Sequence, residues 1–212
     1  MLDVITAPVP GRRTELESMF RLRDEIFNQR MNWDVESKDG MERDQFDDVN
    51  PIYFLAYDDY GALSGTWRLL PTTGSYMIRD VFPFLLEDEE APNSFEIWEA
   101  SRFAVGGNYS GRDGLAAVNK VTGELFCGLI EFCVLNGIEE IITAYDVRIA
   151  RLLKRIDCHP FWQSGMHKIG NTTAIAGRFK TNLEVLERIR EATGTTNSAI
   201  RDVFPSVADL AA

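Results

Sequence analysis

The run FEIWEASRFAV at residues 95–105, the glycine turn GGNYSGRDG at 106–114 and the run IEEIITAY at 138–145 decide the fold. The first and third runs have the aromatic and aliphatic content of buried strands. The stretch between them predicts a helix whose apolar face carries Leu115, Val118, Leu125, Leu129 and Phe132. Strand, glycine turn, helix and strand form a β-α-β unit, which favours parallel pairing of the two strands.

The flanking sequence predicts further elements of both kinds. A helix is expected over 14–29 with Thr14 as its N-cap, and a hairpin over 52–57 and 62–70. After the β-α-β unit come a helix from Asp146 to 156, a strand over 174–179, and a last helix that the Thr181-Asn182-Leu183-Glu184 signature opens and Gly194 ends. We therefore expect one α/β domain over 1–212, a central sheet with helices on its faces.

Composition excludes several classes of protein. The 212 residues include 33 acidic and 22 basic side chains, a net charge of −11 that repels nucleic acid and anionic membranes. No run approaches the length of a membrane span, and the N-terminus lacks a secretory signal, so a cytoplasmic location is expected. Three cysteines are an odd count for a disulfide framework, and we expect them to be small core residues.

Charged residues stand where apolar ones are expected. Arg23 lies on the apolar stripe of the first helix, and either pairs with a buried carboxylate or extends its stem out to water. Arg68 lies inside a strand of the hairpin. Glu99, Ser101 and Arg102 occupy the centre of the 95–105 strand. Charges inside strands are costly unless paired, so these residues are site candidates or members of a structural ion-pair network.

Residues 28–51 show no convincing period, but contain Trp33 and Phe46 among charges and turn residues. Segments of this length without regular structure are usually binding loops, lids or disordered segments. The two aromatic residues argue against a disordered segment. We expect a functional loop here.

Other common sites are absent from the sequence. There is no phosphate loop of the GxxxxGK[ST] type and no G-x-S-x-G elbow. His159 and His167 stand eight residues apart without ligand-like companions, so we expect no metal and no permanently bound cofactor. The turn Gly111-x-x-Gly114-x-Ala116 partly resembles the acyl-CoA-binding turn of GNAT-type acetyltransferases, with glycine in place of the first Gln or Arg; a plain turn is the alternative.

Four blocks of sequence resemble the acyl-homoserine-lactone synthases, the LuxI-type autoinducer synthases. They are Arg23-x-x-x-Phe27 followed by Trp33, the loop ERDQFD at 42–47, WRLLP at 67–71, and WEASRF at 98–103. Order and spacing match from about residue 20 to 105. Beyond that the resemblance is looser and rests on the β-α-β plan, Ile142-Thr143 and the segment 153–155.

The resemblance implies a GNAT-like α-β-α sandwich with a mixed, twisted sheet and a two-part reaction. The amine of S-adenosylmethionine is acylated by an acyl thioester, and its carboxylate then displaces methylthioadenosine to close a lactone, a quorum-sensing signal. It implies that S-adenosylmethionine is held by aromatic faces and a charge network made of Arg23, Phe27, Trp33, Asp44, Asp47 and Arg68. Aromatic and acidic groups suit a substrate with a sulfonium and an ammonium group.

The resemblance also implies catalytic roles for Glu99, Ser101 and Arg102. We expect Glu99 to be the general base, acting directly or through a water, with a pKa raised by burial. Backbone N–H groups near Phe103 are candidates to polarise the thioester carbonyl. The expected acyl-chain pocket is lined by Phe82, Leu125, Ile141 and Thr143, and Thr143 matches a family position linked to 3-oxo chains; simple core packing is the alternative.

The resemblance implies that the acyl group comes from acyl carrier protein or from coenzyme A. Carrier protein is acidic, and Arg148, Arg151, Lys154 and Arg155 form a basic patch at helical spacing that suits it; a solvated face is the alternative. Two other functions stay open at this point: a GNAT-type transferase acting on another amine, and a non-catalytic S-adenosylmethionine-binding domain.

Overall fold

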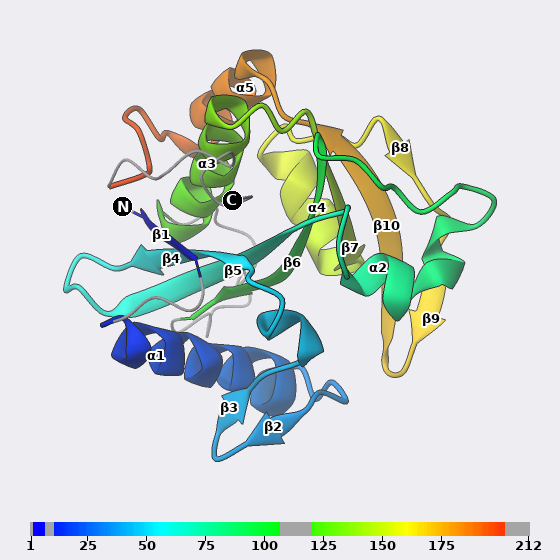
Figure 1. Cartoon of the computed structure of the whole chain (residues 1–212). Coiled ribbons are helices and arrows are strands. Elements are labelled where there is room, and N and C mark those ends of the chain that lie inside the picture. The colour runs from blue at the N-terminus through cyan, green and yellow to red at the C-terminus, as the bar shows by residue number, and fades with distance from the viewer. Residues whose placement is uncertain (1, 7–10, 107–119, 202–212) are drawn as a thin grey trace.

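A mixed β-sheet forms the centre of the computed structural model, which describes residues 2–6, 11–106 and 120–201 (Figure 1). Within these residues eight strands join in the order β1-β4-β5-β6-β7-β10-β8, with β9 on β10. Their bounds are β1 Leu2–Thr6, β4 Ile52–Tyr57, β5 Leu63–Pro71, β6 Ile97–Val105, β7 Glu140–Asp146, β8 Trp162–Gln163, β9 His167–Ile169 and β10 Thr172–Lys180. The β6–β7 pair is parallel and the other pairs are antiparallel, as the β-α-β unit predicts.

Helices cover both faces of the sheet, which confirms the expected α-β-α sandwich (Figure 1). They are α1 Arg13–Arg23, α2 Met77–Asp80, α3 Lys120–Leu135, α4 Val147–Arg155 and α5 Leu183–Thr193. Because side chains alternate along a strand, Leu69 and Ile141 pack with α3, α4 and α5, whereas their neighbours Leu70 and Ile142 pack with α2. Helix α1 covers the same face of the sheet as α2.

The parallel strands β6 and β7 separate along their length. Their register runs from Ile97↔Glu140 to Glu99↔Ile142, yet β6 continues to Val105 and β7 to Asp146. Backbone N–H groups of a strand point alternately to its two edges, so some of those on β6 beyond Glu99 face a gap instead of β7. The gap is the opening on which the site is built.

Several helix boundaries differ from those predicted from the sequence. The first helix begins at Arg13 with Arg12 as its N-cap, so Thr14 as the cap is wrong, and the chain widens after Arg23 into a π-helix over Asp24–Arg30. In the last helix the side chain of Asn182 accepts the backbone N–H of Val185. Strands β1, β8 and β9 were not expected.

The 28–51 loop has more regular structure than its sequence suggested. It contains a small hairpin, β2 Ser37–Lys38 with β3 Met41–Glu42, and a 3₁₀ turn over Gln45–Asp47. Asp44 caps that turn by accepting the backbone N–H of Phe46, and Asp47 accepts the backbone N–H of Asp44 in return. This reciprocal box fixes both carboxylates in place.

Two further findings complete the fold. The three cysteines, Cys127, Cys133 and Cys158, are buried and unbonded, as expected for core residues. No helix among the described residues is long and apolar enough to cross a bilayer. Two predicted features lie outside the described residues. They are the glycine turn at 111–116 and the first part of the expected helix face, Leu115 and Val118.

Candidate active site

Arg23 is fully buried and paired with two carboxylates, which answers the question that the sequence left open. Its Nη1 and Nη2 donate to Asp47 Oδ1 and Oδ2 at 2.8 and 2.9 Å, and its Nε donates to Glu42. Burial alone would raise the pKa of Asp47, but the charges of Arg23 and Arg68 outweigh it and hold that pKa well below its usual range. Asp47 is therefore ionised in the folded protein at neutral pH.

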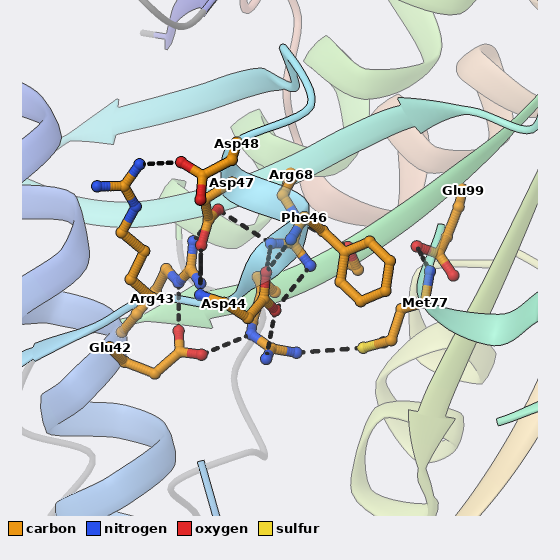
Figure 2. A network of polar contacts seen from close by, with 12 residues as sticks. Glu42, Arg43, Asp44, Phe46, Asp47, Asp48, Arg68, Met77 and Glu99 are labelled. Carbon is orange, nitrogen blue, oxygen red and sulfur yellow. Dashed lines mark hydrogen bonds and ion pairs between the residues drawn. The ribbon is translucent and has the colours of Figure 1, made fainter. Parts of the chain in front are cut away.

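Arg68 extends the same network from β5 (Figure 2). Its Nη1 donates to Asp47 Oδ1 at 2.9 Å, its Nη2 to Asp44 Oδ2 at 3.1 Å, and its Nε to the hydroxyl of Ser101 at 3.1 Å. The Arg68 side chain is fully buried. A bidentate guanidinium held on three sides is a rigid group, so the network is a fixed scaffold.

Arg102 joins the network because a β-bulge turns its side chain. Thr66 pairs with Ala104 and Arg68 with Ser101, so two residues of β6 stand opposite one residue of β5. Arg102 has φ +57°, and the bulge places the consecutive side chains of Ser101 and Arg102 on the same face of the sheet. Its Nε donates to Glu42 Oε1 at 3.0 Å, and its Nη2 lies 2.6 Å from Asp44 Oδ2.

An aromatic pair stands beside the exposed end of this network. The rings of Phe27 and Trp33 are stacked, with centroids 5.3 Å apart and planes 6° apart. Phe27 comes from the π-helix and Trp33 from the loop after it, and the guanidinium carbon of Arg102 lies 5.7 Å from the Phe27 centroid. The pair offers a flat apolar surface next to charge, which suits an aromatic or cationic ligand group.

Glu99 is fully buried on β6 and faces α2. Its Oε1 and Oε2 accept the backbone N–H groups of Ile78 and Met77 at 2.6 and 2.9 Å. Burial raises the pKa of Glu99 to about 7, with the two backbone N–H groups opposing the rise. The Met77 side chain runs from this point to Arg102, where its sulfur lies 3.3 Å from Nη1 (Figure 2).

A cleft of about 110 Å³ opens between the unpaired ends of β6 and β7. At one end its walls include the aromatic pair, Met77, Ser101 and Arg102. The other end is mostly apolar, and is lined by Trp67, Phe103, Phe126, Leu129, Ile130, Ile141, Thr143, Ala144, Tyr145, Asp146, Ile149, Leu153, Cys158 and Phe179. The cleft therefore joins a charged and aromatic end to an apolar end.

The structure brings together most of the site residues predicted from the sequence, but not all. Ile141 and Thr143 line the cleft. Leu125 lies instead in the core against Gly65, and Phe82 packs with Leu85 on the α2 side of the sheet. Arg148, Arg151, Lys154 and Arg155 are all exposed on α4, whose inner face contributes Ile149 and Leu153 to the cleft.

No role was predicted for Glu42, Met77 or Trp67. Glu42 is fully buried and bridges Arg23 and Arg102. A charge count offers the missing signal, since three arginines, two of them buried, need more partners than Asp44 and Asp47 supply. Met77 and Trp67 carried no signal, because their place in the cleft depends on α2 and the bulge. Within the described part of the chain no group of His, Cys, Asp and Glu is placed to hold a metal ion.

A splayed mixed sheet around an apolar cleft places the protein among the acyltransferases with a GNAT-like fold. Residues 11–189 match the family model for autoinducer synthases, and the chain belongs to that family. An acyl-homoserine-lactone synthase of Aliivibrio fischeri (strain ATCC 700601 / ES114) is 41% identical over 163 residues, which cover 76% of this chain and 83% of the relative.

Solved structures agree with this assignment. The acyl-homoserine-lactone synthase LasI superposes with a TM-score of 0.77 at 32% identity, over 90% of this chain and 94% of LasI. The coenzyme A-dependent synthase BjaI, solved with S-adenosylmethionine and isopentyl-CoA, superposes with a TM-score of 0.82 at 25% identity, over 100% of this chain and 97% of BjaI.

Proposed function

We propose that this protein is an acyl-homoserine-lactone synthase that acylates the amine of S-adenosylmethionine from an acyl thioester and closes the lactone with release of methylthioadenosine. The observation that carries the proposal is one continuous cleft that joins a charged and aromatic end to an apolar end. A substrate with an adenine and two cationic groups suits the first end, and a fatty chain suits the second. A GNAT-type transferase acting on another amine would not need the aromatic and charged end, and family membership does not favour it.

The charge network organises the S-adenosylmethionine end. Its three guanidinium groups are matched by three carboxylates, those of Glu42, Asp44 and Asp47, so its formal charges cancel. Arg102 and Asp44 are the members that reach solvent, with side chains 15% and 16% exposed. We assign substrate contact to these two: Arg102 to the substrate carboxylate and Asp44 to a cationic group.

The aromatic pair completes this end. The Trp33 and Phe27 rings offer stacking area for the adenine and a π-face for the sulfonium. The fully buried members, Arg23, Arg68 and Asp47, act by holding the 28–51 loop against the sheet. Binding and support are therefore divided between accessible and buried residues of one network.

Glu99 is the proposed general base. The substrate ammonium must lose a proton before its nitrogen attacks the thioester, and a base with a pKa near 7 is suited to that transfer at neutral pH. The carboxylate lies behind Met77 and is fully buried, so a water relay to the cleft is the route we propose. Ser101, held by Arg68, lines the cleft two residues further along the same strand.

The reaction has two bond-forming steps. The free amine attacks the thioester carbonyl, an amide bond forms, the C–S bond breaks, and the thiolate leaves and is protonated. A carboxylate oxygen then attacks the γ-carbon, the bond from that carbon to the sulfonium breaks, and neutral methylthioadenosine leaves. Backbone N–H groups of β6 near Phe103, in the segment without a β7 partner, are proposed to stabilise the oxyanion of the first step.

The acyl chain is proposed to occupy the apolar end beside Ile141 and Thr143. Acyl carrier protein is the donor that we favour, docked on the basic face of α4. That helix has its exposed cations outside and its cleft-lining residues inside, so a carrier bound there is next to the cleft. We place the reaction in the cytoplasm, in keeping with three unbonded cysteines.

The test is incubation of the pure protein with S-adenosylmethionine and a panel of acyl donors, followed by mass spectrometry. Lactone together with methylthioadenosine is the expected product pair. A linear acylated amine would support the generic transferase, and S-adenosylmethionine binding without turnover would support a regulatory domain. Either of those results would overturn the proposal.

A further inference from the structure

The side chain of Asn171 contacts the loop that carries Trp33, although the two lie far apart in the chain. Its Nδ2 donates to the backbone carbonyls of Met31 and Asn32 at 3.3 and 2.8 Å. Both carbonyls follow the π-helix, at a point where the backbone leaves the helical hydrogen-bond pattern. A primary amide has two N–H donors, so one side chain satisfies both acceptors.

The peptide group between Asn32 and Trp33 is held at both of its ends. Its carbonyl accepts the Asn171 amide, and its N–H donates to the carbonyl of Phe27 at 2.9 Å. Asn32 has φ +50°, in the left-handed region that a non-glycine residue adopts at some cost. The hydrogen bonds from Asn171 offset part of that cost. They also set the direction in which the Trp33 side chain leaves the backbone.

The turn that carries Asn171 is tight. The pair Thr172↔Ile169 closes a two-residue turn between β9 and β10. Gly170 supplies the positive φ, +54°, that such a turn needs at its first position, and Asn171 takes the second. Ile169 packs against the apolar cluster that contains Leu85. The Asn171 side chain therefore starts from a fixed position.

The contact joins the two sides of the gap between β6 and β7. On one side the π-helix packs on β6 through Phe27 and Ala104. On the other side the Asn171 turn continues into β10, the neighbour of β7. The hydrogen bonds from Asn171 therefore connect the β7 side of the gap to the aromatic pair at the charged end of the cleft.

We propose that Asn171 is a positioning residue for S-adenosylmethionine, because it holds the Trp33 ring parallel to Phe27 in the orientation that the substrate contacts. The inference rests on the proposed function and deepens it, since it adds a residue that sets the affinity for one of the two substrates. Asn171 is not among the residues that line the cleft. It acts through Trp33 and not by touching the substrate.

The test measures the dissociation constant for S-adenosylmethionine by calorimetry without an acyl donor, and then steady-state kinetics. Asn171→Ala removes both donors and is expected to raise that constant, and KM for S-adenosylmethionine, by about fivefold. Both kcat and KM for the acyl donor are expected to stay within about twofold, because Glu99 and the apolar end are untouched. Asn171 is exposed, so the variant is expected to fold.

A double-mutant cycle tests whether Asn171 acts through the ring. In the Trp33→Ala background the ring is absent, so adding Asn171→Ala is expected to raise the dissociation constant by no more than about 1.5-fold. Gln163→Ala is the matched control. Gln163 is an exposed neutral amide on β8, which is also paired with β10. Its removal is expected to leave the dissociation constant unchanged.

An unchanged dissociation constant in Asn171→Ala, or an equal rise in Gln163→Ala, would overturn the inference while leaving lactone synthesis intact. A full rise that persists in the Trp33→Ala background would also overturn it, because Asn171 would then act independently of the ring. If the wild-type protein neither binds S-adenosylmethionine nor releases methylthioadenosine, the proposed function fails and the inference fails with it, so the two failures are distinguishable.

Discussion

Phe27 and Trp33 lie face to face, with ring centroids 5.3 Å apart and planes 6° apart, although one comes from a π-helix and the other from the loop after it. The backbone N–H of Trp33 donates to the backbone carbonyl of Phe27 at 2.9 Å, and this hydrogen bond connects the loop to the helix. The widened helical turn thus creates the flat surface on which we place S-adenosylmethionine.

Trp33→Ala is expected to raise KM for S-adenosylmethionine by about tenfold, because the substrate loses one face of its aromatic contact. KM for the acyl donor is expected to stay within about twofold, since the apolar end is untouched. Steady-state kinetics with each substrate varied separately measures both. Trp33→Phe keeps a stacking ring and serves as the conservative control; a loss as large as that of the alanine variant would argue against stacking.

Asp47→Asn is expected to destabilise the protein by about 3–5 kcal/mol, because it removes one charge from a buried network and leaves Arg23 and Arg68 short of a partner. Denaturant unfolding measures the change. Asp48→Asn is the control, since its pair with Arg43 is exposed and is expected to cost less than about 1 kcal/mol. Equal losses in the two variants would contradict the assigned role of the network.

The Asp47 carboxylate also makes the free energy of unfolding depend on pH. Because the folded pKa of Asp47 is lower than the unfolded value of 3.8, its contribution to stability is present above that value and is lost as the pH falls below it. The free energy of unfolding of the wild-type protein is expected to drop more steeply in acid than that of Asp47→Asn. Parallel curves in acid would mean that Asp47 titrates normally.

Glu99→Gln is expected to cut kcat by about a hundredfold or more, the usual scale for losing a general base. In the wild-type protein kcat should rise with pH and level off above about 7, the pKa of Glu99, and this limb should vanish in the variant. Glu131→Gln is the control: Glu131 is also buried and accepts a backbone N–H, from Ala199, but lies away from the cleft. Near-normal turnover in Glu99→Gln would remove Glu99 as base.

Glu99 also makes the free energy of unfolding depend on pH, in the opposite direction to Asp47. The folded protein keeps this proton up to about pH 7, whereas the unfolded chain releases it near 4.5. Between those values the native state binds more protons, so the free energy of unfolding is expected to fall as pH rises. The fall should be absent in Glu99→Gln.

Sequence patterns were sufficient to predict the helices and strands that depend on residues close together in the chain. The parallel β6–β7 pair follows from strand, turn and helix in order, and Asp146 caps α4 as its spacing predicts. Arg23, Arg68 and Arg102 were found because a charge on an apolar stripe or strand is conspicuous. The resemblance joined them to Asp44 and Asp47, and the structure places all five side chains in one network.

What the sequence missed depends on contacts between distant segments. The bulge that turns Arg102 needs the register of β5 against β6, and no pattern within 95–105 encodes it. Leu125 and Phe82 have the apolar character of cleft residues, but the side of the sheet or helix that each faces is set by packing. The hairpin at 37–42 is short and exposed, and its fold is held by the buried Glu42.

The double variant Arg151→Glu and Lys154→Glu is expected to raise the apparent KM for acyl carrier protein by about tenfold while sparing acyl-CoA, because it cancels the positive charge of the α4 face. Arg13→Glu with Arg21→Glu makes the same change in net charge on α1, where the side chains of Arg13 and Arg21 are 91% and 56% exposed. That control is expected to affect neither donor. An equal effect of the α4 variant on both donors would defeat the docking proposal.

A crystal structure of the protein with S-adenosylmethionine would locate the substrate. We expect it against Phe27 and Trp33, with its carboxylate on Arg102 and its amine directed toward the gap between β6 and β7. A second hollow lies on the far side of the network, beside Phe20 and Tyr53. S-adenosylmethionine bound in that hollow, with the β6–β7 cleft empty, would show that the cleft is not the S-adenosylmethionine site.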